Sequence, residues 1–220
     1  MTNKKYFFLA LAGCLALACL VSFGQKPDNQ LWTGATIKLK LNKKLRFDLE
    51  EQARFNNNIS RLNITYTEGG IKYDLNKYIS FKGNFRYTYD PYSHNSYRYN
   101  GDFDYDWSKK RFPLRLKYRL RFQRNIEAHT LEAASYLRNK FSAGYNLSKP
   151  VDPYIEYESY FKLSYINKFT TNRFIIGLEW KITRNIDIDT FYMLEDEFGE
   201  RNPGIKNVFG IGLSYDFKLY

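Results

Sequence analysis

The C-terminal stretch Val208-Phe-Gly-Ile-Gly-Leu-Ser-Tyr-Asp-Phe-Lys-Leu-Tyr220 alternates apolar side chains with glycine or polar ones. Because successive side chains of a β-strand point to opposite faces, one face of this stretch is apolar and the other is small or polar. The apolar face consists of Phe209, Ile211, Leu213, Tyr215, Phe217 and Leu219. The stretch therefore predicts a strand that ends the chain and borders an apolar environment on one side.

The same alternation recurs in ten earlier blocks that are separated by turn-forming residues. The eleven blocks are residues 31–41, 45–55, 62–75, 79–89, 97–107, 111–123, 137–147, 154–165, 173–182, 186–194 and 208–220. They predict an all-β fold, a single up-and-down antiparallel transmembrane β-barrel of 10–12 strands. Because bacterial single-chain barrels have an even number of strands, we expect 10 or 12 strands, with one block merged or missed. We also expect a bulge at Gly69-Gly70 and longer connections at 124–133 and 195–207.

The start of the chain is typical of a signal peptide. Lys4 and Lys5 precede an uncharged run from Tyr6 to Phe23, and Ser22-Phe23-Gly24 forms a small-x-small cleavage site. We expect cleavage after Gly24, so that residues 1–24 are removed and residues 25–220 form the barrel. Lipoprotein processing at Cys14, within Leu11-Ala-Gly-Cys14, is the alternative, although it leaves an apolar run of only about eight residues.

Composition limits the function classes of the exported chain. Cys14 and Cys19 both lie in the expected signal peptide, so residues 25–220 have no disulfide, thiol nucleophile or cysteine metal site. Removing residues 1–24, which carry two lysines and no acid, lowers the net charge from +11 to +9. A basic, aromatic-rich chain could suggest nucleic acid, but export argues against that partner. No later apolar run reaches the roughly 18 residues of a spanning helix.

The predicted location is the outer membrane of a Gram-negative bacterium. A soluble sandwich would bury the same apolar faces, but the signal peptide, the 20 tyrosines and 18 phenylalanines, and the end of the chain favour a membrane. Apolar faces then meet lipid, since a lipid-facing arginine costs about 2–4 kcal/mol. The end of the chain resembles the assembly signal of bacterial outer-membrane barrels, which Gly212, Tyr215 and Phe217 match with a three-residue overhang. The partners expected are outer-membrane lipids, lipopolysaccharide and the barrel assembly machinery.

A ladder of opposite charges is predicted inside the barrel. If residues 97–107 and 111–123 form a hairpin, three acids lie across from three bases on the inward face. The ladder consists of Asp102, Asp104, Asp106, Arg115, Lys117 and Arg119. Such a ladder either selects solutes in a channel or fills the interior, and we favour filling because a barrel of 10–12 strands is narrow.

Catalytic and metal sites have little support in the sequence. Asp102-Phe-Asp-Tyr-Asp106 lacks the glycine and glutamate of a calcium loop, so we predict neither a metal nor a cofactor. The two histidines fall in predicted outer loops, where a serine, a histidine and an acid could form the catalytic group of a lipid-modifying acyl hydrolase or transferase. The candidates are His94, His129, Ser93, Ser96 and Glu127. No nucleophile motif accompanies them, so an enzyme is the alternative rather than the prediction.

Four segments together resemble the family named domain of unknown function 2490, outer-membrane β-barrel proteins common in Bacteroidetes. They are Leu31-Trp-Thr-Gly34, the charged block from Asp48 to Phe55, Tyr136-Leu-Arg-Asn-Lys140 and the aromatic end. The resemblance covers essentially all of residues 25–220 and implies no activity or catalytic residue. We therefore predict an integral outer-membrane barrel of structural or narrow-passage type. A lipid-modifying enzyme and a surface-binding protein that works through its outer loops are the alternatives.

Overall fold

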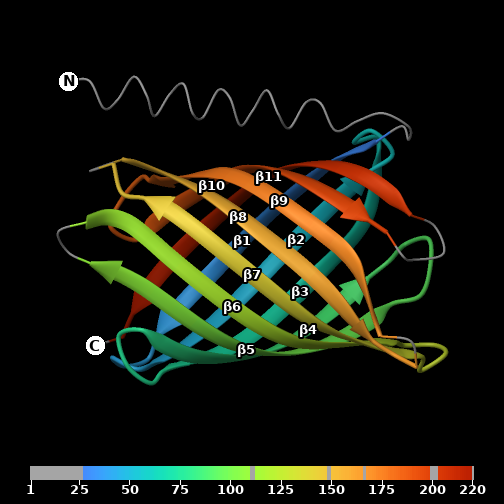
Figure 1. Cartoon of the computed structure of the whole chain (residues 1–220), viewed down its shortest axis with the longest axis horizontal. Helices are drawn as coiled ribbons and strands as arrows, with labels where there is room; N and C mark the ends of the chain where they lie inside the picture. Colours follow the sequence, from blue (N-terminus) through green and yellow to red (C-terminus); the bar gives the residue numbers. More distant parts are fainter. Residues whose placement is uncertain (1–26, 110–111, 148–149, 166, 199–202, 220) are drawn as a thin grey trace.

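The computed structural model describes residues 27–109, 112–147, 150–165, 167–198 and 203–219, and the expected signal peptide lies outside them. These residues form eleven strands in one closed barrel (Figure 1). The strands are β1 (Asp28–Lys40), β2 (Leu45–Asn56), β3 (Arg61–Asp74), β4 (Ile79–Tyr89), β5 (Ser96–Lys109), β6 (Phe112–Glu127), β7 (Ala133–Tyr145), β8 (Val151–Leu163), β9 (Lys168–Lys181), β10 (Ile186–Glu197) and β11 (Gly204–Lys218). The fold is therefore the predicted all-β, up-and-down barrel, and each predicted block is one strand.

The barrel closes through a parallel pair. Every pair of strands adjacent in the chain is antiparallel, whereas β1 and β11 run in the same direction, from Leu31 opposite Phe209 to Leu39 opposite Phe217. The expectation of an even number of strands was wrong for this reason. An even count is required only if the first and last strands are antiparallel, and a parallel pair closes an odd number. The predicted pattern of wholly antiparallel pairing fails at this one seam.

The two ends of the barrel differ. At one end, here the turn end, β1 leads to β2, β3 to β4, β5 to β6, β7 to β8 and β9 to β10; at the other, the loop end, β2 leads to β3, β4 to β5, β6 to β7, β8 to β9 and β10 to β11. β1 begins at the loop end and β11 finishes at the turn end, at the right and left of Figure 1. Because β1 and β11 are parallel, the start of β1 and the finish of β11 lie at opposite ends of the barrel.

Several predicted boundaries were too short. β6 continues to Glu127 and β10 to Glu197, so the predicted connections at 124–133 and 195–207 shrink to 128–132 and 198–203. The predicted bulge at Gly69-Gly70 was wrong, because β3 passes through both glycines in continuous register with β2 and β4. Gly70 instead makes room for a neighbour, since a Cβ there would lie 2.2 Å from Oδ1 of Asn84.

The division of faces follows the predicted alternation. Large apolar side chains point outward and are exposed, among them Ile71 at 58 % and Phe174 at 53 %. Charged side chains point inward, and Glu158 is only 2 % exposed. The interior is thus polar and the outside apolar, the reverse of a water-soluble globule. No helix in the described part of the chain is long and apolar enough to cross a membrane.

Candidate functional site

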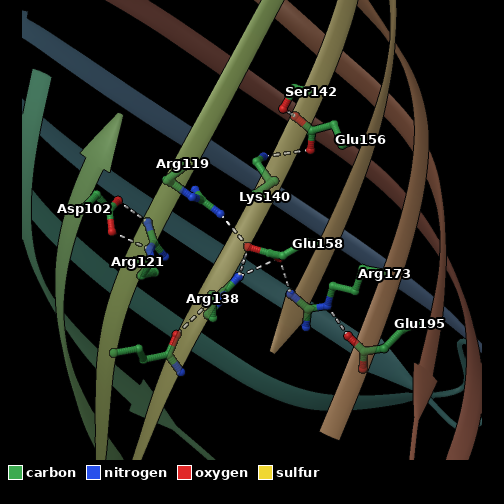
Figure 2. A network of polar contacts seen from close by, with 11 residues as sticks. Asp102, Arg119, Arg121, Arg138, Lys140, Ser142, Glu156, Glu158, Arg173 and Glu195 are labelled. Atoms are coloured by element: carbon green, nitrogen blue, oxygen red, sulfur yellow. Dashed lines mark hydrogen bonds and ion pairs between the residues drawn. The ribbon is translucent and has the colours of Figure 1, made fainter. Parts of the chain in front are cut away.

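The centre of the barrel interior is an ion-pair network around Glu158 of β8 (Figure 2). Nη2 of Arg138 lies 2.9 Å and 2.8 Å from its two carboxylate oxygens, and Nη2 of Arg119 lies 2.8 Å from Oε1. Nη1 of Arg173 approaches Oε2 to 3.5 Å. One buried carboxylate therefore faces three guanidinium groups, which come from β6, β7 and β9. Paired charges of this kind are tolerated inside a protein because each has hydrogen-bonding partners.

The network extends around the barrel wall on both sides of Glu158. Arg173 also donates to Glu195 of β10, which accepts a 3.0 Å hydrogen bond from Lys206 of β11. On the other side, Arg121 holds Asp102 of β5 through two 2.6 Å hydrogen bonds. The ion pairs thus connect inward faces from β5 to β11. Since neighbouring strands are already joined by backbone hydrogen bonds, these contacts fix the interior rather than the wall.

A layer of aromatic rings and arginines lies beside this network, toward the loop end. Cζ of Arg54 lies 3.6 Å from the ring centroid of Trp32, and Cζ of Arg86 lies 3.4 Å from that of Tyr66. Arg138, which also binds Glu158, lies 4.2 Å from the centroid of Tyr160. Cation–π contacts of this kind contribute about 2 kcal/mol when desolvated. The rings therefore compensate part of the cost of burying guanidinium groups.

Together the network and the aromatic layer occupy the interior toward the loop end. Tyr66, Gln123, Glu158 and Glu195 point inward, yet they are 3 %, 2 %, 2 % and 3 % exposed. A small apolar cluster of Trp32, Met193 and Val208, with Ile175 and Phe191 packed against it, fills the same half of the barrel. We call this cross-section the plug. Side chains that line an open channel are wet, so these four residues do not line a water-filled channel.

Below the plug, a cavity of about 350 Å³ lies among the inward faces of β1 and β6–β11. Arg115, Lys117 and Lys140 line its β6–β7 side, whereas Glu179, Asp187 and Asp189 line its β9–β10 side. Nη2 of Arg115 reaches across to Glu179 at 3.2 Å. The cavity is therefore polar, with mainly basic residues on β6–β7 and mainly acidic residues on β9–β10, and Glu156 of β8 and Lys38 of β1 also line it.

Only some residues of the predicted charge ladder pair with the partners predicted from the sequence. Asp104 lies opposite Arg119 and Asp106 opposite Lys117, with an ion-pair distance of 3.4 Å in the second pair. Asp102 instead lies opposite Arg121, which was outside the predicted set. Arg115 and Arg119 reach Glu179 and Glu158 on more distant strands. All six residues have strand positions on the inward face; Asp102 and Asp106 pair with the neighbouring strand β6, whereas Arg115 and Arg119 pair with more distant strands.

The two predicted catalytic histidines meet at the loop end. The rings of His94 and His129 stack with centroids 4.8 Å apart and planes inclined by 22°. Among the described residues, no hydrogen bond joins the hydroxyl of Ser93 or Ser96 to either imidazole, and Glu127 accepts its side-chain hydrogen bond from Thr130. The structure thus brings the histidines together without linking them to the predicted nucleophile or acid.

The remaining predicted residues lie on β11. Gly212 faces the lumen, where a Cβ would meet no atom within 4 Å, and Tyr215 and Phe217 face outward at 38 % and 48 % exposure. No group of three or more histidine, aspartate or glutamate side chains in the described ranges is arranged to hold a metal ion.

The sequence missed the centre of the network. Glu158 and Arg138 were placed on inward faces, but the pattern gives no sign that they meet Arg119 and Arg173. Alternation identifies the face of a strand, whereas these contacts depend on strand register, which places Arg173 directly opposite Glu158, and on the curvature that brings Arg119 over from β6. The available signal was the presence of inward carboxylates on β8, Glu156 and Glu158, next to the inward bases of β7 and β9.

Comparison with known proteins gives a match to a protein family and none to a curated protein. A family model described as protein of unknown function (DUF2490) matches residues 29–203, which includes all of β2–β10. The resemblance predicted from the sequence is thereby confirmed, and the chain belongs to the DUF2490 family.

Proposed function

We propose that the protein is an integral outer-membrane β-barrel with a closed lumen, whose role is structural rather than that of an open pore. The burial of Glu158 and its partners across the lumen is the observation that carries this proposal. The exposed apolar side chains around the outside support contact with lipid, because such a surface is unfavourable in water. The turn end faces the periplasm and the loop end the cell surface, as in bacterial barrels with short periplasmic turns.

Two measurements test the proposal. Single-channel recording in planar bilayers is expected to show no steady conductance, and steady ion-selective openings would show that the lumen is open. The protein is also expected to fractionate with the outer membrane and to migrate differently on gels before and after heating. A purified barrel that stayed monomeric in water without detergent would contradict the membrane location.

The last strand is proposed to be read by the barrel assembly machinery through Gly212, Tyr215 and Phe217. Two features support this role: β11 forms the seam with β1, and the rings of Tyr215 and Phe217 lie 5.7 Å apart on the outward face. Deleting residues 208–220 is expected to abolish assembly in the membrane while export continues. A deletion variant that still gave a heat-modifiable barrel would contradict this role.

A lipid-modifying enzyme is the second candidate function, and the stacking of His94 on His129 is the observation that favours it. Both imidazoles are exposed at the loop end, where the proposed orientation places lipopolysaccharide. The test is the lipid A and phospholipid profile of cells that carry His94→Ala or His129→Ala. Loss of a modified species in either variant would support the enzyme, and unchanged lipids in both would exclude it.

A further inference from the structure

The cavity below the plug has two walls of opposite charge. β6 and β7 supply Arg115, Lys117 and Lys140, and β9 and β10 supply Glu179, Asp187 and Asp189. In the strand order of the closed barrel, two strands separate β7 from β10 and three separate β6 from β10. β8 alone separates β7 from β9, so the two walls lie on either side of β8, and Arg115 spans the space between them to reach Glu179 at 3.2 Å.

In the part of the chain that the structure describes, no cation is in direct contact with the two cavity-lining carboxylates of β10, although Lys38 of β1 also lines the cavity. Among the described residues, Asp187 forms no ion pair or side-chain hydrogen bond, and Asp189 binds only the hydroxyl of Tyr154, which lies 2.8 Å and 3.0 Å from its two oxygens. Glu179 is different, because Arg115 holds it at 3.2 Å. Two carboxylates on β10 thus face the cavity without a cation within 4 Å. Such groups gain from a cationic ligand that can approach them.

The basic wall has a lysine available on the other side. Nζ of Lys117 lies 3.4 Å from Asp106, and the two side chains are 47 % and 40 % exposed, so this is a weak, solvated pair. Lys140 is held more tightly, at 2.7 Å from Glu156. Lys117 can therefore turn toward an anionic group in the cavity at little cost, with Arg115 nearby to share it.

Space for a ligand exists between the walls. The cavity volume of about 350 Å³ lies within the usual range for small-molecule sites. Small side chains make this room on β11, where Ser214 lines the cavity and a Cβ on the neighbouring inward residue Gly212 would meet nothing within 4 Å. The plug closes the cavity toward the loop end, so a ligand would enter from the turn end.

We propose that this cavity is a blind binding pocket for a small zwitterionic solute. The ammonium group of the solute lies against Asp187 and Asp189, and its carboxylate lies against Lys117 and Arg115. A ligand with one charge would satisfy only one wall, whereas an uncharged ligand would leave both walls as they are. The pocket depends on the interior of the barrel and not on the membrane around it, so its test is separate from that of the proposed function.

Calorimetric titration of the folded full-length barrel in detergent tests the pocket. The probes are 6-aminohexanoate and its singly charged analogues hexylammonium and hexanoate. Saturable binding is expected for 6-aminohexanoate, with at least tenfold weaker binding of both analogues. Shorter and longer ω-amino acids are expected to bind less well, because the two walls are a fixed distance apart. Absence of saturable binding by every zwitterion in the series, or equal binding of all three probes, would overturn the proposal.

Variants locate the site. The double change Asp187→Asn with Asp189→Asn and the single change Lys117→Gln are each expected to weaken 6-aminohexanoate binding at least tenfold. Ser214→Phe fills the cavity without removing a charge and is expected to do the same. Asp74→Asn is the matched control, since Asp74 lies at the turn end outside the cavity and is expected to leave affinity unchanged. Heat-modifiable migration confirms that each variant is folded, and normal binding by the three pocket variants would overturn the assignment.

Discussion

Nη2 of Arg138 on β7 lies between both carboxylate oxygens of Glu158 on β8, at 2.9 Å and 2.8 Å, and neither residue is more than 6 % exposed. Each therefore depends on the other for the solvation that water would otherwise supply. Arg119 and Arg173 depend on the same carboxylate. The interior of this barrel is thus held largely by a few shared charges, beside one small apolar cluster around Met193 and Val208.

Glu158→Gln is expected to destabilise the folded barrel by about 3–5 kcal/mol, because removing one partner leaves buried guanidinium groups without compensation. Asp106→Asn is the control and is expected to cost below about 1 kcal/mol, since its pair with Lys117 is solvated. Unfolding by urea in detergent micelles, followed by tryptophan fluorescence, measures both. If both variants lose the same free energy of unfolding, the network around Glu158 stabilises the barrel no more than a solvated ion pair does.

Removing the two rings at the loop side of the plug should open the barrel. Trp32→Ala with Tyr66→Ala deletes the surfaces on which Arg54 and Arg86 lie. The expected result in planar bilayers is steady openings that prefer anions, because arginines then face the gap. Phe85→Ala removes an outward ring that is 43 % exposed and is expected to remain silent. If the double variant folds correctly but shows no conductance, the two rings are not what closes the lumen.

The parallel seam can be trapped with a disulfide. Leu31→Cys with Phe209→Cys joins residues in direct register on β1 and β11, and neighbouring strands have Cα spacings that a disulfide can span. This pair is expected to cross-link in the refolded barrel. Leu31→Cys with Phe217→Cys is not, because Phe217 lies eight residues further along β11, or about 26 Å. The opposite outcome, seen by gel mobility without reductant, would show antiparallel closure.

Substituting alanine for each of two inward glycines on β11 is expected to change the stability of the barrel in opposite directions. Gly210→Ala is expected to destabilise the barrel by about 1–3 kcal/mol, because its Cβ would lie 2.1 Å from the ring of Phe191. Gly212→Ala meets no atom within 4 Å and is expected to be neutral or stabilising by up to about 1 kcal/mol. Urea unfolding of the refolded variants compares them. Gly210→Ala in a Phe191→Ala background should no longer lower the free energy of unfolding, because the ring that the new Cβ meets is absent. If Gly210→Ala lowers it equally in both backgrounds, the clash with Phe191 is not the cause.

The sequence by itself determined the strands and their faces. Alternation with period two is a local property, so each of the eleven blocks could be identified, and the lipid-like and lumen-like faces followed from the same pattern. Boundaries were less certain because polar residues near Glu127 and Glu197 continue a strand at the barrel rim, where water is available. The match to the family was also visible in the sequence alone.

Only the tertiary structure decided how the barrel closes and what fills it. The parallel pairing of β1 with β11 depends on the direction in which the ends of the sheet meet, and no local pattern encodes that direction. The register between neighbouring strands likewise places Arg173 directly opposite Glu158, and Arg119 reaches the same carboxylate from β6, two strands away. Alternation fixes which side chains point inward, but the curvature and stagger of the closed sheet determine which of them meet across the lumen.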